Sequence, residues 1–393
     1  MHEYKKLVAI CVLPTMIVIG NAMFVPIMPS IQHSLALTEG QAAWFLSVFT
    51  FSGICAIPLG QLVARRRGMR KASLLGTLFV VVGSLGAGLT RFFDADSVYL
   101  WFLSMRIVQG IGAGSLAALA MTLVPEQFQK EDQQVVFGQV ELANALAKAL
   151  SPLIGGLLLY LSWTYSFVVF LAVSLMAFVF VLLYLPSEPP SRERKKSIRK
   201  KEKMRKAQLM VCLPAFVLSA AVLFVLYGLL FYASYSFEMQ AFSPASKGIL
   251  LALPLSVMAL VSARSHKIVE RVRISYSQML VLSSALLAGA TALLFLEGGN
   301  VLLMFILALC AVSTGMAMPT SSTFISQKAD ASVRNAALSF LSIVRFAGIA
   351  LAPVVYEQWM NHAHGLLSAG SLAIAVLALL TTWVVPVRRV KHS

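Results

Sequence analysis

The sequence predicts an all-α integral membrane protein with twelve transmembrane helices in two pseudo-symmetric bundles of six. Three observations carry this prediction. Of the 393 residues, 59% are hydrophobic and only 12% are charged, against about 25% charged in a soluble domain. Apolar stretches close to the roughly 20 residues that cross a bilayer recur along the whole chain, and the mean hydropathy is +0.81. One long polar segment divides these stretches six and six.

The apolar runs set the ends of the expected spans. The first run follows Lys5 and Lys6, is too long for a signal peptide and lacks a small-residue cleavage site, so we expect it to remain as a span. In chain order the expected spans are about 8–30, 41–63, 73–90, 98–121, 135–159, 164–186, 209–233, 247–263, 277–296, 300–319, 335–356 and 366–387.

The basic residues follow membrane topology rather than a nucleic-acid-binding surface. The formal net charge is +16, yet with a cytoplasmic N-terminus most of the 32 Lys and Arg residues fall in inward-facing segments. Arg91 and Lys247 fall outside, and Arg106, Lys148 and Arg345 fall within spans. We therefore expect both termini in the cytoplasm, a multi-pass protein of the cell (plasma) membrane, and no nucleic-acid partner.

The polar segment 187–208 is expected to link an N-terminal bundle, 1–186, to a C-terminal bundle, 209–393. Its many Lys and Arg residues would be drawn to anionic lipid head groups, but an ordinary solvated linker explains them equally well.

Weak internal repetition supports two related halves, as in many transporters. The offset between matching positions is nearly constant. The matches are Val12-Leu13-Pro14 with Cys212-Leu213-Pro214, Gly114 with Gly315, and Pro152 with Pro353; Asn144 falls on Arg345.

Other features exclude several function classes. The four cysteines sit in apolar spans without a Cys-x-x-Cys pair, so we expect no disulfide framework and no metal site. The spans hold no paired carboxylates or His-x-x-x-His motif, and the chain has no Gly-x-x-x-x-Gly-Lys-Ser/Thr loop. We therefore expect no enzyme, no cofactor and no ATP-driven pump.

The fourth span carries the most informative motif, in which Arg106 and Gln109 lie one turn apart before three glycines, Gly110, Gly112 and Gly114. An arginine within a span costs about 2.5–3.5 kcal/mol on insertion scales, so it faces the protein interior or a water-filled path. The alternative is a purely structural interhelical hydrogen bond. The glycines allow close helix packing.

The fifth span carries Glu141, Asn144, Lys148, Ser151 and Pro152, most of them on one broad stripe. A low dielectric favours the protonated form of a carboxylate, whereas a nearby cation favours the ionised form. Glu141, the one acidic residue clearly within a span, is thus the candidate proton carrier. The alternative is a permanently ionised carboxylate that pairs with Arg106, Lys148 or Arg345.

Three cations within spans against one carboxylate favour a substrate with an anionic or electronegative portion. Aromatic and methionine side chains of the first and seventh spans, such as Phe24 and Phe231, would instead offer an adaptable apolar wall. The candidate cavity residues are Asn21, Phe24, Arg106, Gln109, Asn144, Lys148, Tyr227, Phe231 and Arg345.

These motifs resemble those of the major facilitator superfamily, and within it the drug:proton antiporters, over essentially the whole chain. Arg106 to Gly114 match the span-four signature Arg-x-x-Gln-Gly-x-Gly-x-Gly in full. The span-five signature appears as Ala147-x-x-x-Ser151-Pro152-x-x-Gly155-Gly156, with two early glycines replaced by small residues.

The third signature departs from the family pattern. The loop between spans two and three, usually Gly-x-Leu-Ala-Asp-Arg-x-Gly-Arg-Arg, reads Gln61 to Arg70 and has Arg65 in place of the aspartate. The resemblance implies a gating role for this loop, and the acid could have moved to Glu270 in the second half. The gating candidates are Arg65, Arg66, Gly68, Arg70, Glu270 and Arg271. Asn21 stands near where many relatives carry an acid, which leaves Glu141 for proton work.

The resemblance implies two six-helix bundles that rock about a central cavity, a monomer, and export, because the span-five signature is typical of exporters. The leading hypothesis is a proton-coupled exporter of small amphipathic compounds, with Glu141 and Arg106 in proton coupling. Export or flipping of an anionic metabolite or lipid-linked solute is the alternative, as is a transport-inactive sensor. Small molecules, protons and membrane lipids are the expected partners.

Overall fold

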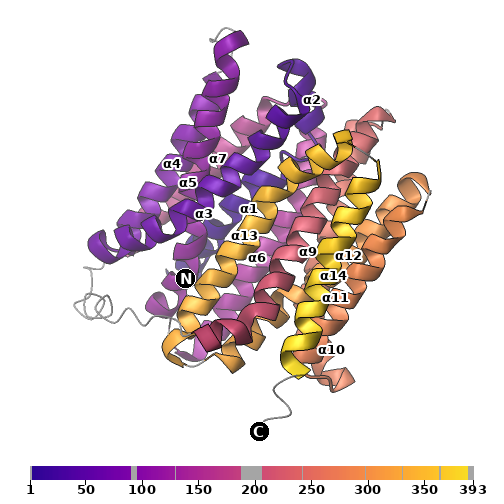
Figure 1. The fold of residues 1–393 in the computed structure, drawn as a ribbon. Coiled ribbons are helices and arrows are strands. Elements are labelled where there is room, and N and C mark those ends of the chain that lie inside the picture. Colours follow the sequence, from indigo (N-terminus) through magenta and orange to yellow (C-terminus); the bar gives the residue numbers. More distant parts are fainter. Residues whose placement is uncertain are drawn as a thin grey trace. The chain divides into compact units, whose positions relative to one another are not determined.

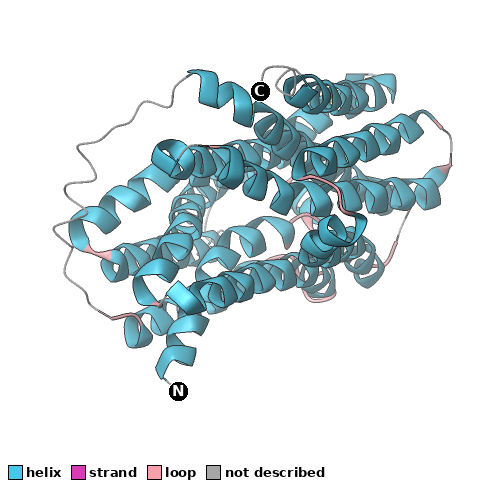
Figure 2. Ribbon diagram, turned by 90° about the horizontal axis from the view of Figure 1, so that it is seen from below, coloured by secondary structure: helices cyan, strands magenta, loops and turns pink. Residues whose placement is uncertain are grey.

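The computed structural model describes residues 2–89, 95–128, 130–186, 206–240, 242–296, 298–329, 331–362 and 364–387. Within these ranges the regular structure is helical throughout (Figure 2). Eleven of the described helices are long and apolar enough to cross a membrane, and the shorter apolar segment Leu142–Leu158 falls where the fifth span is expected. The predicted all-α, multi-pass membrane fold is therefore confirmed.

The first compact unit comprises Met1–Lys200 and Ser243–Ala252. Within it α5 packs against α1, α3 and α4, and α1 also packs against α6 and α7, so α1 and α5 form its centre (Figure 1). Its helices are α1 (His2–Ala22), α2 (Met28–Ser34), α3 (Glu39–Arg67), α4 (Met69–Gly88), α5 (Ala95–Gln127), α6 (Lys130–Leu158) and α7 (Tyr165–Tyr184).

The second unit comprises Lys201–Phe242 and Leu253–Ser393. Here α9 is central, since it packs against α12, α13 and α14. The helices are α9 (Lys206–Met239), α11 (Tyr276–Ala292), the 3₁₀ turn η2 (Leu293–Phe295), α12 (Gly299–Lys328), α13 (Ala331–His362) and α14 (His364–Val387), with α10 (Pro244–Val272) running from the segment grouped with the first unit. The expected linker lies mostly outside the described residues, and its last three positions are already part of α9.

Local sequence signals explain several helix ends. Thr38 and Gln41 form a reciprocal capping box at the start of α3, and Ser275 and Gln278 form another at the start of α11. Gly68 joins α3 to α4 with a φ of 90°, a conformation that favours glycine. These residues therefore fix where the helices begin and where the chain reverses direction.

The first expected span, 8–30, is broken in the structure. Helix α1 ends at Ala22, a turn covers residues 23–27, and α2 starts at Met28. Pro26 and Pro29 explain the break, because each lacks the N–H that would continue the helical ladder. Phe24 therefore lies in a turn rather than on a continuous helix.

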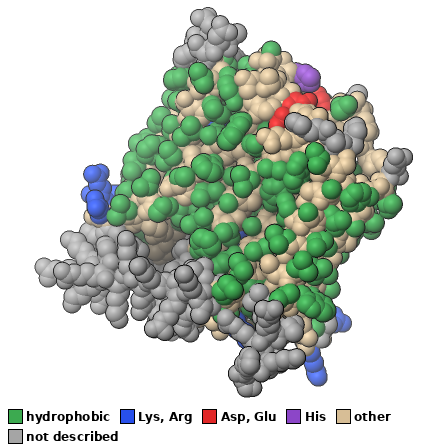
Figure 3. Space-filling view, viewed as in Figure 1, with side chains coloured by type: hydrophobic (Ala, Val, Ile, Leu, Met, Phe, Trp, Pro, Cys, Tyr) green, Lys and Arg blue, Asp and Glu red, His purple; other side chains and the backbone are tan. Residues whose placement is uncertain are grey.

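The outer surface of the helices is mostly apolar. On the face drawn in Figure 3, hydrophobic side chains cover the helices, and the coloured Lys, Arg and acidic side chains appear at the edges. Lys247 lies in the first turn of α10 and is only 3% exposed.

Candidate functional site

The side chain of Arg106, on α5, is fully buried in the first unit and donates from all three guanidinium nitrogens. Nε donates to the carbonyl oxygen of Phe45 at 3.3 Å, Nη1 to Oε1 of Gln109 at 3.0 Å, and Nη2 to the carbonyl oxygen of Gly20 at 2.8 Å. These acceptors are uncharged and come from α1, α3 and α5. The cation thus ties three helices together.

The contact with Gly20 has a local cause in α1. The carbonyl of Gly20 would normally accept from the N–H of Phe24, but that N–H donates to Asn21 at 3.1 Å as the chain turns. The last carbonyls of a helix lack intrahelical donors and carry the negative end of the helix dipole. Arg106 therefore caps the C-terminal end of α1 with a positive charge.

Three aromatic rings complete the surroundings of the guanidinium. Its carbon Cζ lies 4.7 Å from the ring centroid of Phe24, 4.6 Å from that of Phe45 and 4.2 Å from that of Phe49. Cation–π attraction of this kind is worth about 2 kcal/mol when desolvated. The rings and carbonyl oxygens together compensate a buried cation with neutral groups.

Two further hydrogen bonds extend this cluster. Nε2 of Gln109 donates to Oγ of Ser84 on α4 at 3.2 Å, so Gln109 links Arg106 to a fourth helix. Asn21, at the end of α1, donates from Nδ2 to Oγ1 of Thr50 on α3 at 2.7 Å. Of the cavity candidates, Asn21, Phe24, Arg106 and Gln109 therefore meet in one buried cluster.

The glycines of the span-four motif explain how α5 approaches its neighbours so closely. A Cβ at Gly110 would lie 2.1 Å from the carbonyl oxygen of Phe49, and one at Gly112 would lie 2.5 Å from that of Gly76. A Cβ at Gly114 would lie 2.2 Å from the carbonyl oxygen of Gly53. Helix α5 thus packs backbone to backbone on α3 and α4.

The span-five segment also relies on small residues. A Cβ at Gly155 would lie 2.2 Å from the carbonyl oxygen of Met23, in the turn after α1. A Cβ at Gly156 would lie 2.6 Å from Cα of Gly248, in the part of α10 that groups with this unit. Ser151 donates back to the carbonyl oxygen of Ala147, and Pro152 removes one N–H from the ladder of α6.

The remaining candidates of α6 lie on a partly exposed stretch. Asn144 and Lys148 are half-buried, whereas the side chain of Glu141 lies outside the described part of the structure. The amide oxygen of Asn144 is buried and accepts no hydrogen bond from the groups that the structure describes. Within the same described ranges, no three His, Cys, Asp or Glu side chains gather as a metal site would need.

The candidates of the second unit lie on two helices. Tyr227 and Phe231 are buried on α9. Arg345, half-buried on α13, donates from Nη2 to the carbonyl oxygen of Met318 and, at 3.2 Å, to Oγ of Ser322, both on α12. This arginine, like Arg106, bridges helices through uncharged acceptors.

The loop candidates lie at helix ends. Arg66 and Arg67 are exposed at the end of α3, and Arg271 is exposed near the end of α10. Arg70 donates from Nη2 to the carbonyl oxygen of Leu182, third from the end of α7, at 2.5 Å. The side chains of Arg65 and Glu270 lie outside the described part of the structure.

Several residues of these clusters escaped the sequence analysis. Phe45 and Phe49 supply a carbonyl and two rings around Arg106, and their spacing of four on one helix face was the available signal. Gln61 donates to Oγ1 of Thr122 at 2.9 Å, which ties α3 to α5. Tyr356 of α13 is fully buried and shares a 2.6 Å hydrogen bond with Ser371 of α14.

Comparison with known families gives a match over most of the chain. Residues 10–353 match the family described as Major Facilitator Superfamily. The chain is 28% identical over 389 residues to the bacillibactin exporter of Bacillus subtilis (strain 168), which covers 95% of this chain and 94% of that protein.

Two further relatives match over part of the chain. The chloramphenicol resistance protein CraA of Acinetobacter baumannii is 28% identical over 174 residues, which is 44% of this chain and 41% of that protein. The multidrug transporter MdfA of Edwardsiella ictaluri is 26% identical over 181 residues, or 46% and 43% of the two chains.

Solved structures share the fold at low sequence identity. A D-xylose-proton symporter superposes with a TM-score of 0.81 at 14% identity and 98% coverage of both chains. The inward open xylose transporter XylE from E. coli gives 0.74 at 14% identity, over 96% of this chain and 95% of that one. Identities this low extend the comparison to the fold alone.

Proposed function

The chain belongs to the major facilitator superfamily, whose members are transporters and not enzymes, and from this premise we propose that it exports small amphipathic compounds in exchange for protons. The proposal includes a cell-membrane location with both termini in the cytoplasm, and a monomer that alternates between inward-open and outward-open states. In this proposal the two bundles, 1–186 and 209–393, move relative to each other during transport.

The observation that carries export is the packing of Gly155 and Gly156. The sequence pattern around them is typical of exporters, and in this chain both glycines make contacts that a Cβ would prevent. A relative that matches nearly the whole chain is also named as an exporter. The two partial relatives, named for chloramphenicol resistance and multidrug transport, support small amphipathic substrates.

The residues divide into two roles in this proposal. Glu141, on α6, exchanges the proton, and Asn144 and Lys148, one and two turns further along, face the substrate. Carbonyl oxygens and aromatic rings enclose Arg106, so in this proposal it does not touch the substrate. Its positive charge instead acts electrostatically on the proton site from a position that the cluster fixes. The buried amide oxygen of Asn144 accepts no hydrogen bond from the described residues, which supports a hydrogen bond donated by the substrate at this position.

The proposal is tested with purified protein in liposomes that enclose a pH-sensitive dye. A panel of lipophilic cations, neutral drugs and organic anions is added outside. We expect one charge class to drive proton movement, and Glu141→Gln to abolish it while Gln139→Glu, which adds a carboxylate at an exposed position nearby, leaves the wild-type response. Proton movement that survives Glu141→Gln would remove that residue from coupling.

Export of an anionic metabolite is the second candidate. Arg345 favours it, because this half-buried cation lies between α12 and α13 next to the hydroxyl of Ser322. A relative over 95% of the chain, the bacillibactin exporter, is named for the export of a single compound and not for drug resistance, which also supports this candidate.

This second candidate has its own test. Binding of anionic and neutral ligands to the purified protein would be compared for the wild type, Arg345→Ala and Arg345→Lys. Selective loss of anion binding in Arg345→Ala, with partial recovery in Arg345→Lys, is expected. Equal affinity of Arg345→Ala for both ligand classes would exclude an anion-binding role for this residue.

A further inference from the structure

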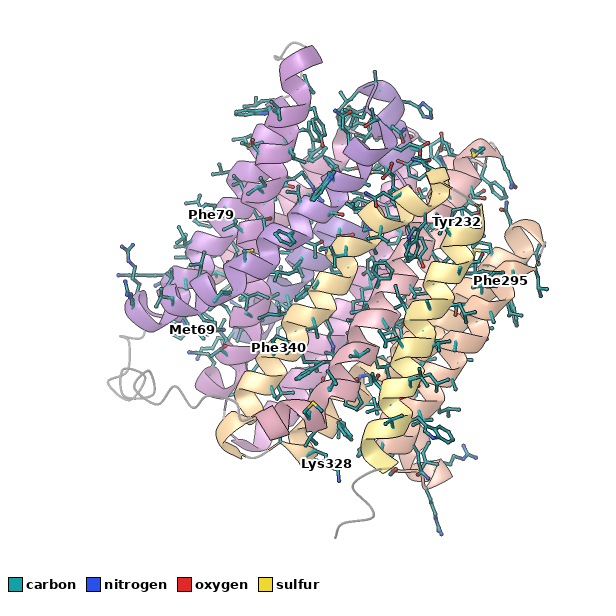
Figure 4. All side chains as sticks on the ribbon, in the orientation of Figure 1. Met69, Phe79, Tyr232, Phe295, Lys328 and Phe340 are labelled. Carbon is teal, nitrogen blue, oxygen red and sulfur yellow. The ribbon has the colours of Figure 1, made fainter. Side chains whose placement is uncertain are left out.

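The turn between α3 and α4 concentrates positive charge without an acid nearby in sequence. It carries Arg65, Arg66, Arg67, Arg70 and Lys71, and no Asp or Glu occurs between Glu39 and Asp94. Arg66, Arg67 and Lys71 are exposed. Figure 4 labels Met69, which opens α4 at this turn. A run of exposed like charges attracts an external counter-charge.

The outward face of α3 leads directly into this turn. Its exposed side chains recur at helical spacing, with Phe51 54% exposed, Leu59 57% and Leu62 41%. Arg66 follows Leu62 by four residues, so it continues the same stripe. The cation thus stands at the end of an apolar face that meets lipid chains.

The outward face of α4 also carries a stripe of exposed apolar side chains, but here the cation comes first in the sequence and the apolar residues follow. Lys71 starts a stripe that continues with Leu75, Leu78, Val82 and Leu85, which are 39%, 45%, 50% and 54% exposed. Two apolar stripes, on helices that contact each other, therefore end at Arg66 and Lys71, which stand five residues apart on either side of the turn. This placement matches a phospholipid, whose acyl chains run along the helices and whose phosphate lies at their end.

Contacts within the first unit place two more helix ends beside this turn, and one of them, the start of α1, carries a further cation. Arg70 binds the carbonyl oxygen of Leu182, near the end of α7. Lys5 of α1 lies 5.3 Å from the ring centroid of Tyr184, the last residue of α7. The start of α1, the α3–α4 turn and the end of α7 thus share one end of the unit.

The corresponding turn of the second unit is different. Arg271 and Arg273 are exposed there and Arg264 is exposed about two helical turns earlier on α10, but an acid, Glu270, directly precedes Arg271 in the sequence. The outward stripe of α11 begins with the uncharged Ser275 and Gln278 instead of a lysine. The two units therefore differ in the charge that they present at equivalent places.

We propose that the α3–α4 turn, through Arg66 and Lys71, binds the phosphate of an anionic phospholipid whose acyl chains lie along the apolar stripes of α3 and α4. Each basic side chain near a membrane surface contributes a similar increment of attraction to anionic lipid. The exposed leucines on both stripes favour a lipid over a nucleic acid or an acidic protein. The site is independent of the transported substrate.

The test uses native mass spectrometry of the purified full chain with dioleoyl phosphatidylglycerol or dioleoyl phosphatidylcholine. We expect the wild type to prefer phosphatidylglycerol, and Arg66→Gln/Lys71→Gln to weaken its binding at least tenfold. The matched control, Arg264→Gln/Arg271→Gln, removes the same charge from the second unit and should change the affinity less than twofold. Arg66→Lys/Lys71→Arg should retain binding.

Three results would overturn the proposal. They are equal weakening by the two double variants, equal binding of the two lipids by the wild type, and displacement of the lipid by millimolar inorganic phosphate, which would indicate a free-anion site. If Arg66→Gln/Lys71→Gln does not fold, thermal stabilisation of the wild type by each lipid is measured at low and high NaCl. Stabilisation by phosphatidylglycerol that is insensitive to salt would equally contradict it.

Discussion

The guanidinium of Arg106 donates to the carbonyl oxygen of Gly20 at 2.8 Å, across 86 positions of sequence. Gly20 is the third residue from the end of α1, just before the chain breaks into a turn. A second arginine, Arg70, makes the equivalent contact with Leu182, the third residue from the end of α7. In both places an arginine caps the negative end of a helix dipole.

The geometry at Arg106 predicts that its shape matters as well as its charge. Arg106→Gln leaves the carbonyl of Gly20 without its donor and removes the additional donor to Phe45, which should lower the stability by about 1–3 kcal/mol. Arg106→Lys keeps the charge, but a single ammonium cannot reach acceptors on three helices, so we expect a clear though smaller loss. Thermal unfolding of the purified protein measures both.

The matched control for Arg106 is Arg66→Lys, since Arg66 is exposed at the end of α3. It should leave the unfolding temperature unchanged. An Arg106→Lys variant as stable as the wild type would show that charge alone is required and would contradict the capping role.

The sequence predicted the fold well because apolar length and charge placement are local properties. It also identified Arg106 and Gln109 as unusual, since their polarity conflicts with the span around them. It did not predict the partners, because Gly20 contributes only a backbone carbonyl, and the spacing of Phe45 and Phe49 does not distinguish rings around a cation from ordinary core packing. The break after Ala22 was detectable from Pro26 and Pro29, but overall hydrophobicity masked it.

Glycine packing on α5 gives a second prediction. Gly114→Ala would place a Cβ 2.2 Å from the carbonyl oxygen of Gly53, so the backbones of α3 and α5 must separate. Overpacking of this kind costs about 1–3 kcal/mol. We expect a lower unfolding temperature and a smaller folded fraction, measured by fluorescence-detected size-exclusion chromatography.

Gly289 provides the comparison, because it is also helical but a Cβ there meets nothing within 4 Å. Gly289→Ala should be neutral or stabilising by about 0.5–1 kcal/mol, as alanine loses less backbone entropy in a helix. Equal losses in both variants would show that sensitivity to alanine does not depend on the α3–α5 contact.

The two halves use the repeated positions in different ways. Gly155 of α6 packs on the carbonyl oxygen of Met23, whereas Tyr356, at the position 201 residues later, packs its ring on Gly228 of α9. In the first half the small residue, Gly155, lies on α6, whereas in the second half the small residue, Gly228, lies on the helix against which Tyr356 packs. A comparison of residues at a constant offset cannot find this exchange, because the close contact is retained while the residue types that make it are swapped.

This exchange predicts coupling between Gly228 and Tyr356. A Cβ at Gly228 would lie 2.1 Å from Cε2 of the tyrosine ring, so Gly228→Ala should be destabilising. Tyr356→Ala alone leaves a cavity and should cost about 3–5 kcal/mol, yet adding Gly228→Ala to it should cost little more. A double-mutant cycle by thermal unfolding measures the coupling, and purely additive losses would contradict the contact.

Tyr356→Phe separates the ring from its hydroxyl group. It removes the 2.6 Å hydrogen bond with Ser371 while keeping the packing on Gly228, so we expect a loss of about 1 kcal/mol. Ser371→Ala should give a similar loss, and the double variant should be no worse than either single one. A larger loss in the double variant would mean that the two hydroxyls act on different partners.

The last prediction concerns the proposed gate at the end of α3. Arg65 replaces the acid that the family signature carries, so Arg65→Asp restores the usual charge beside Arg66 and Arg67. If this turn gates, the distance distribution between spin labels on the two halves should shift towards the outward-open state. Arg67→Asp makes the same charge change two residues later, on a different face of the helix, and is the control. An unchanged distribution in Arg65→Asp would exclude a gating role for this position. An identical shift in both variants would show that a general change of surface charge, rather than this position, causes the effect.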